Sequence, residues 1–394
     1  MFSKVSFEIE LQRDGRWMAE ATYEQEEDAR VMLAKLLRSR DDCTAGRIMK
    51  QTTSMTGNTR SGEIFQQARD AKDAPLTLTG NPETAPVCKD ADTCFALPAR
   101  MAMARLLKMF LDKFQIGPME LLHSQSFLKK FDEATTLIAA GFHQVGTAQA
   151  KQLGITTNER IAALMDFYKQ IHARAKRFMD MRKSLPGLLA DDINTTHAAV
   201  LRDNAAAAQV NFNHLVTFEF QTGMYVAREQ KLSVIVTWFN EAKEKELRAW
   251  LDEWIADYLC FPEIIDGLLG QQFNFYEFLL RVIEVALGNK KLTKSADSPQ
   301  LTSLRTALAS GALPMSQTVL VDRLVREIRT EKPLDRRDIE REEILIKDLE
   351  RALRMEGGAM LGGRATEDAI AARKLRERKR KLRAMGLDDV ADNI

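Results

Sequence analysis

The hydrophobic and polar positions of this 394-residue chain follow two periods, one near its start and another through most of the remainder. Val5, Phe7 and Ile9 alternate with polar residues, as in a β-strand with one buried face. Asp14-Gly15 follows as a hairpin-turn signal, because glycine accepts the positive φ that tight turns require. A second strand is therefore expected over residues 17–23.

A helix and two more strands are expected after this hairpin. Glu24-Gln25-Glu26-Glu27 places acids where a helix N-terminus favours them, ahead of helically spaced leucines. Residues 48–53 and 61–65, on either side of Gly57-Asn58, have the pattern of short strands. The pattern predicts a β-β-α-β-β module over residues 1–66, and a module of this size is more often a docking unit than an enzyme.

Residues 67–98 have the composition of a flexible linker. Pro75, Pro82, Pro86 and Pro98 interrupt this stretch, and few large apolar residues are present to anchor it. We therefore expect the N-terminal module to be tethered loosely to the rest of the chain.

From residue 99 onward the helical period dominates, which predicts a mainly helical domain over residues 99–356. Thr156 and Glu159 have the spacing of a capping box at the start of one helix. Pro186-Gly187 marks a point near residue 186 where this domain could divide. Residues 212–240 fit either period, and their helical flanks favour helix.

Aromatic residues concentrate between Trp238 and Phe278. Trp250 and Trp254 are four residues apart and so share one helical face. A ligand pocket is one interpretation of this concentration, but a helical core is the more typical use of such residues.

Residues 357–363 contain four glycines, each of which costs regular structure about 1 kcal/mol relative to alanine. A hinge is expected here, so residues 357–394 form a glycine hinge and a basic terminal helix. The predicted fold class is α+β: a small N-terminal β-hairpin/helix module, a Pro-rich linker, and a mainly α-helical body with a basic C-terminal helix.

The basic terminal helix is the sharpest charge feature. Its run holds eight basic residues and one acid, a net +7, which leaves −6 for the rest of a chain whose total is +1. The basic residues are the predicted electrostatic contact residues: Arg373, Lys374, Arg376, Arg378, Lys379, Arg380, Lys381 and Arg383. Nucleic-acid phosphates, an anionic membrane surface and an acidic protein surface are all suitable partners, and a simple solvated helix is the remaining interpretation.

The overall composition is that of a cytoplasmic globular protein. Charged residues make up 29% of the chain, and the opening residues lack the apolar run of a signal peptide. No stretch of about 18 apolar residues is present to form a transmembrane segment. Four scattered cysteines do not form a disulfide scaffold, so reduced thiols are expected.

The motifs that could carry chemistry are weak. Glu120 and His123 have the spacing of a di-iron helix ligand pair, but no other histidine has a matching glutamate. Residues 141–147 have the glycine spacing of a phosphate loop, with threonine in place of its lysine. Cys88 and Cys94 are separated by five residues and have no nearby histidine, which favours free thiols over a zinc site. We therefore assign no catalytic, cofactor-binding or metal-binding residues and expect no cofactor.

A resemblance bears on the source of the chain. Gly311-Ala312-Leu313-Pro314 and Leu361-Gly362-Gly363 lie in a stretch, residues 301–363, that resembles the C-terminal helical region of a loosely defined set of uncharacterised bacterial proteins. Asp14-Gly15-Arg16-Trp17 and the following helix resemble the N-terminal module of the same set. The resemblance implies a bacterial cytoplasmic protein and no particular activity.

The sequence leaves three functions open. The first is a non-enzymatic adaptor or regulatory protein that acts through protein–protein contacts. The second is a nucleic-acid or anionic-surface binding protein that uses the basic C-terminal helix. The third is an enzyme of unrecognised type, whose site would be assembled only by the fold.

Overall fold

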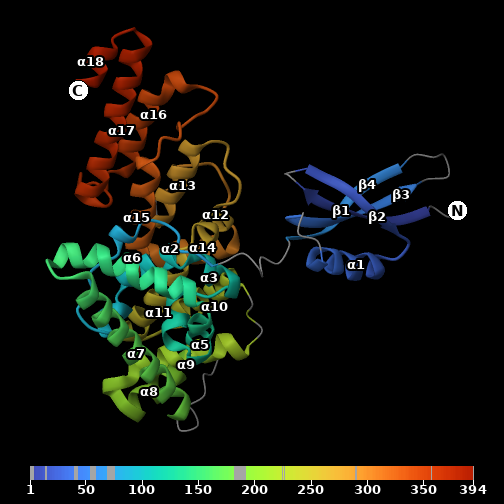
Figure 1. The fold of residues 1–394 in the computed structure, drawn as a ribbon. Helices are drawn as coiled ribbons and strands as arrows, with labels where there is room; N and C mark the ends of the chain where they lie inside the picture. The colour runs from blue at the N-terminus through green and yellow to red at the C-terminus, as the bar shows by residue number, and fades with distance from the viewer. Residues whose placement is uncertain are drawn as a thin grey trace. The chain divides into compact units, whose positions relative to one another are not determined.

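The computed structural model divides into two compact units, Met1–Pro75 and Leu76–Ile394 (Figure 1). It describes residues 4–13, 16–39, 43–53, 59–68, 76–181, 192–223, 225, 227–288, 291–355 and 357–393. The first unit is a small antiparallel sheet with one helix, and the second is helical. The predicted α+β class is confirmed.

The first unit has the predicted β-β-α-β-β order. Its elements are β1 (Lys4–Arg13), β2 (Arg16–Tyr23), α1 (Glu26–Ser39), β3 (Ala45–Thr53) and β4 (Thr59–Ala68), and all strand pairs are antiparallel in the order β2-β1-β3-β4. Arg13 pairs with Arg16 across the first hairpin. The predicted turn residues Asp14-Gly15 and Gly57-Asn58 lie outside the described residues.

The core of the first unit follows from the alternation in β1. Phe7, Ile9 and Leu11 face α1, where Leu33 is fully buried. Each large aliphatic side chain buried this way contributes about 2 kcal/mol or more. Gly46 on β3 lies so close to α1 that an added Cβ would come within 2.3 Å of the Leu33 side chain. The small residue at this position therefore lets the helix pack directly on the sheet.

The second unit is a bundle of short helices (Figure 1). The α-helices are α2 (Leu97–Leu106), α3 (Lys108–Phe114), α4 (Pro118–His123), α5 (Gln125–Glu133), α6 (Thr135–Leu153), α7 (Thr157–Met181), α8 (Ile193–Asn204), α9 (Ala208–Thr222), α10 (Arg228–Glu241), α11 (Lys245–Leu259), α12 (Pro262–Leu269), α13 (Phe275–Leu287), α14 (Pro299–Ala309), α15 (Pro314–Arg329), α16 (Glu342–Leu353), α17 (Gly363–Ala384) and α18 (Asp388–Asp392). Helices α16, α17 and α18 lie at one end of this unit, and α7 and α8 lie at the other (Figure 1).

Helix α11 is central to the core of the second unit. It packs against α10 and α15, and its Trp254 and Tyr258 are fully buried. The core interpretation of the aromatic residues is thus confirmed for Trp250 and Trp254. Residues 212–222 fall in α9 and residues 228–240 in α10, so the helical prediction is confirmed for these two parts of the stretch.

The structure differs from the expected linker at residues 76–98, which belong to the helical unit. Ala85, Cys88 and Cys94 are buried in this unit although their segment has almost no regular structure. Side chains from other helices donate hydrogen bonds to backbone carbonyls of this segment. Gln149 donates to the Pro86 carbonyl at 2.6 Å, and Arg160 donates to the Cys88 carbonyl at 2.7 Å. Small apolar residues and distant donors therefore anchor a proline-rich segment whose regular structure before α2 is two short 3-10 helices, η1 (Pro82–Thr84) and η2 (Asp92–Phe95).

The structure also differs from the expected hinge at residues 357–363. The backbone N–H of Met355 donates to the Ala359 carbonyl at 2.8 Å, and that of Leu361 donates to the Leu353 carbonyl at 2.9 Å. Gly357 and Gly358 have φ of 93° and 85°, which residues with a Cβ rarely adopt. The glycines permit a tight turn that returns the chain onto the bundle, and α17 then packs against α15 and α16.

Among the described residues, no helix is both long enough and apolar enough to cross a membrane.

Candidate binding grooves

Arg373, the first residue of the basic run, is a structural residue. Its side chain is only 5% exposed. Its Nε and Nη2 donate to the Glu342 carboxylate at 3.0 and 2.7 Å, and its Nη1 donates to the Ile328 carbonyl at 3.1 Å. This arginine attaches α17 to α15 and α16, so it is not presented to a partner.

Most of the other basic residues contact acids of the same unit. Lys374 pairs with Glu350, Arg380 with Glu377, Lys381 with Glu343, and Arg383 with Asp392. Arg376 donates to a backbone carbonyl on α15. Within the described part of the chain, Arg378 and Lys379 take part in no ion pair, and Arg378 is exposed. The structure thus brings the predicted contact residues onto one packed helix, and five of the eight are held in ion pairs.

A groove of 400 Å³ lies between α16 and α17, and we call it the α16–α17 groove. It combines apolar and charged side chains from both helices: Ile346, Leu382 and Met385, the cations Lys347, Lys374, Arg378 and Lys381, and the acids Glu343 and Glu377. Hydrogen bonds from Lys347 and Lys381 lower the pKa of Glu343 to about 2, so this carboxylate is ionised at neutral pH. Four cations and two carboxylates give the groove a local charge of +2.

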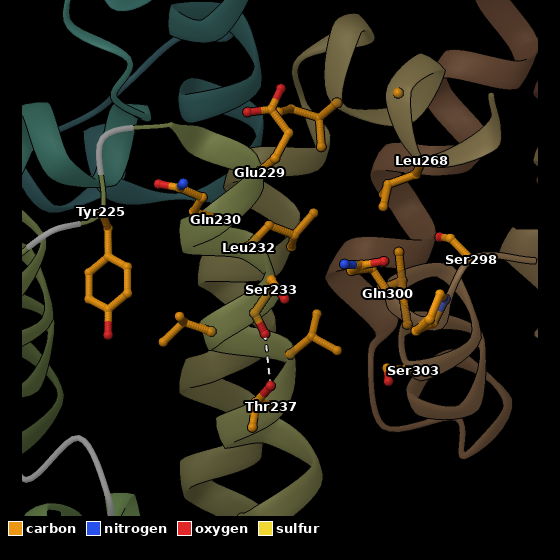
Figure 2. A pocket seen from close by; sticks show the side chains of 16 residues that line it. Tyr225, Glu229, Gln230, Leu232, Ser233, Thr237, Leu268, Ser298, Gln300 and Ser303 are labelled. Carbon is orange, nitrogen blue, oxygen red and sulfur yellow. Dashed lines mark hydrogen bonds between the residues drawn. The ribbon is translucent and has the colours of Figure 1, made fainter. Parts of the chain in front are cut away.

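A larger groove of 890 Å³ lies between α10, α12 and α14, and we call it the α10–α12–α14 groove (Figure 2). Along α10, Glu229, Ser233 and Thr237 line it at intervals of four residues. Glu229 and Thr237 are eight positions apart and so about 12 Å apart along the helix axis, since an α-helix rises 1.5 Å per residue. Across the groove, Ser298, Gln300 and Ser303 of the α14 region face α10, and Leu268 of α12 lies beside them (Figure 2).

The chemistry of the α10–α12–α14 groove is apolar and neutral. Leu232, Val236 and Leu304 are buried in its floor. Hydroxyl and amide groups form its rims, and the Thr237 hydroxyl donates to the Ser233 carbonyl at 3.0 Å (Figure 2). Among the described residues that line it, Glu229 is the one with an acidic or basic side chain. Such a surface suits binding and offers no acid–base pair for catalysis.

Glu120 and His123 contact different neighbours. The Glu120 carboxylate pairs with Lys231 at 2.7 Å and accepts a hydrogen bond from the Tyr258 hydroxyl at 3.1 Å. His123 donates through Nδ1 to the Met119 carbonyl at 2.9 Å. Burial lowers the pKa of His123 well below its usual value, so the ring is neutral. In the described ranges, no three His, Cys, Asp or Glu side chains are grouped as metal ligands would be.

His123 also lines a cavity of 510 Å³ between the segment before α2 and helices α2, α4, α7, α9 and α11. Arg100 is fully buried there and reaches Glu253 at 3.5 Å and Asp257 at 3.4 Å. At the mouth of the cavity, Arg174 pairs with Asp92. The charges of this cavity are therefore matched within the protein, and no excess charge is left to attract an ionic ligand.

Cys88 and Cys94 lie close together and beside Arg160. The Cys94 thiol donates to the Asp90 carbonyl at 3.6 Å, and its hydrogen-bond contact with the Cys88 sulfur lowers the pKa of Cys88 to about 7 and raises that of Cys94. Both cysteines line an apolar cavity of 180 Å³. Residues 141–147 lie inside α6, so their backbone is helical and does not form a phosphate loop.

Neither groove was predicted from the sequence, although part of the α16–α17 groove comes from the basic run. Ser233 and Thr237 are four residues apart, as any two residues on one helical face can be. Lys347 and Met385, which line the α16–α17 groove, are likewise not part of any recognisable sequence motif. The grooves exist because helices distant in sequence lie side by side, and only the fold shows this.

The chain was compared with models of protein families, with curated proteins and with solved structures, and none of them matches it.

Proposed function

We propose that this protein is a non-enzymatic adaptor or regulatory protein of the bacterial cytoplasm, which binds a segment of a partner protein on its helical unit. The observation that carries the proposal is the α10–α12–α14 groove. It is the larger of the two grooves, and it combines an apolar floor with neutral polar rims.

The shape and the rims of the groove favour a polypeptide. Seven of the nine residues of α10 from Glu229 to Thr237 line an elongated surface of about 12 Å. Serine hydroxyls and the Gln300 amide can both donate and accept, so they match the N–H and C=O groups of a peptide backbone. A partner segment with apolar side chains for the floor and no strong net charge fits this surface best.

The buried ionisable groups support a binding function over a catalytic one, because they pair with one another inside the bundle. Asp257 accepts a hydrogen bond from the Met119 backbone N–H at 3.0 Å and contacts Arg100. Glu120 and Lys231 pair with each other at 2.7 Å. These groups stabilise the bundle through contacts within the protein, and none of them lines the α10–α12–α14 groove.

Peptide selection on the whole protein tests this proposal. A phage-displayed library of short random peptides is selected on the wild-type chain, and the enriched peptides are measured by fluorescence anisotropy. S233R/S303R places two long cations in the groove, whereas N240R/T306R adds the same charge at exposed positions of the same helices. We expect S233R/S303R alone to abolish binding. Equal binding by both variants would refute the proposal.

The alternative function, binding of nucleic acid or an anionic membrane through the basic run, has less support. Most of its cations already contact acids within the protein. Arg373 is buried, and ion pairs with acids of the same unit are formed by Lys374, Arg380, Lys381 and Arg383. The acids that face these cations would repel a uniformly negative backbone, which makes a polyanion a poor match for this surface.

A further inference from the structure

The α16–α17 groove has a chemistry of its own. Its rim carries the cations Lys347, Lys374, Arg378 and Lys381, and its acids Glu343 and Glu377 reduce the net charge only to +2. Ile346, Leu382 and Met385 supply an apolar surface between the charges. This combination differs from the neutral α10–α12–α14 groove, so a different kind of partner is required.

The apolar side chains near this groove are unusually exposed. Met385 is 71% exposed, and Leu387 and Val390, which follow it, are 45% and 48% exposed. On α16, Ile344 is 54% exposed. Met385 itself lines the groove, and methionine and arginine are enriched at the centres of interfaces.

We propose that the α16–α17 groove binds an acidic amphipathic segment of a partner protein. Carboxylates of this segment contact Arg378 and the lysines of the rim, and its apolar side chains pack on Leu382 and Met385. Arg378 is the central cation of this site because it is exposed and forms no ion pair within the described residues. The guanidinium also suits bidentate contact with a carboxylate.

Existing ion pairs do not block such a partner. The Lys374 and Lys381 side chains are 46% and 40% exposed, and their acids Glu350 and Glu343 are 25% and 49% exposed. Ion pairs this exposed contribute little to stability, so the lysines can turn toward an incoming carboxylate. Glu343 and Glu377 stay in the groove, where they can accept hydrogen bonds from N–H groups of the partner or pair with its cations.

An acidic protein segment fits this groove better than nucleic acid or a lipid surface does. A nucleic-acid backbone is uniformly negative, and it would meet Glu343 and Glu377 as well as the cations. A membrane surface is too broad to enter a groove between two helices. An amphipathic segment can place acids against the cations and apolar groups against Met385, so both features of the groove are used.

The test uses a fluorescein-labelled helical peptide of Glu, Ala and Leu with leucines along one face, and full-length protein at low and at moderate salt. K374E/R378E reverses two charges in the groove. R351E/R364E makes the same change in net charge at exposed positions on α16 and α17 outside it. We expect K374E/R378E to weaken binding by about tenfold or more, whereas R351E/R364E changes it little. M385S should weaken binding without altering its salt dependence.

Four results would overturn the proposal: no binding of the peptide, equal loss in both charge variants, equal binding of a Gln-for-Glu peptide, or groove-dependent binding of duplex DNA or phosphatidylserine vesicles in preference to the peptide. The two grooves lie on different helices and have separate variants. Failure of the peptide test therefore leaves the proposed function standing, and loss of the α10–α12–α14 interaction leaves this site untouched.

Discussion

Arg373 of α17 and Glu342 of α16 form a buried ion pair in which two guanidinium nitrogens donate to the same carboxylate oxygen at 3.0 and 2.7 Å. Their side chains are 5% and 8% exposed. The other Glu342 oxygen accepts a hydrogen bond from the Leu334 backbone N–H at 2.8 Å. The pair therefore holds the terminal helix on the bundle and also fixes the chain that enters α16.

Arg373→Ala should destabilise the helical unit by about 3–5 kcal/mol, because Glu342 is left buried and without its cation. Chemical denaturation followed by circular dichroism measures this loss. Arg364→Ala is the control, since Arg364 is on the same helix and its side chain is 91% exposed. A loss below about 1 kcal/mol for Arg373→Ala would show that the pair does not attach α17.

Gly117 and Gly267 make a second matched comparison. An added Cβ at Gly117 would come within 2.2 Å of a carboxylate oxygen of buried Asp257, whereas nothing lies within 4 Å at Gly267. Gly117→Ala should cost about 1–3 kcal/mol through overpacking. Gly267→Ala in α12 should be neutral or stabilising by up to about 1 kcal/mol, because alanine favours helix. Equal effects in thermal denaturation would contradict the close packing at Gly117.

Acid should destabilise the fold through His214. Burial lowers its pKa to about 4, and its Nδ1 donates to the His123 carbonyl at 2.8 Å. An unfolded histidine takes up a proton below its ordinary pKa of 6.5, but the folded one stays neutral until about pH 4. The unfolded state therefore binds more protons between these values, and the free energy of unfolding falls as the pH falls through this window.

The full effect of His214 is on the order of 3 kcal/mol, since one pKa unit corresponds to about 1.4 kcal/mol. Urea denaturation between pH 7 and pH 4, compared for wild type and His214→Asn, isolates it. Asparagine keeps a donor near the Nδ1 position but does not titrate, and His123 is present in both proteins. The variant should lose stability less steeply on acidification. Parallel slopes would mean that His214 is not buried as a neutral ring.

Of the three cysteines in the helical unit, Cys88 should alkylate most readily near neutral pH. Its pKa is about 7, whereas burial raises the pKa of Cys260 and the shared hydrogen bond raises that of Cys94. The apolar cavity beside Cys88 gives room for a small reagent. Iodoacetamide labelling with peptide mass spectrometry should show Cys88 modified before Cys94 and Cys260, at a rate that levels off above about pH 8. Faster labelling of Cys94 or Cys260 than of Cys88 would contradict the lowered pKa of Cys88.

Local signals predicted the parts of the fold that depend on neighbouring residues. Alternation in Val5, Phe7 and Ile9 indicated β1, and Thr156 and Glu159 form the capping box expected from their spacing. Residues 76–98 could not be predicted this way. Their anchors are small side chains such as Cys88, and their backbone partners, Gln149 and Arg160, come from other helices.

The candidate site was less predictable than the fold. Eight basic residues in one run indicated an accessible cationic helix, but the acids that pair with them, among them Glu342, Glu343 and Glu350, lie in a helix more than twenty residues earlier. No local pattern shows that these acids lie opposite the run. The α10–α12–α14 groove is likewise formed by helices some sixty residues apart in the chain.

Site-specific photo-crosslinking tests the central proposal most directly. A benzophenone amino acid replaces Thr237, which is exposed and lines the α10–α12–α14 groove, or Asn240, which is exposed on the same helix outside it. The chain is irradiated with a peptide enriched in the library selection. We predict a crosslinked peptide from position 237 and none from position 240, with the product lost when S303R is added. Equal crosslinking at the two positions, or none at 237, would contradict the proposal that this groove holds a partner polypeptide.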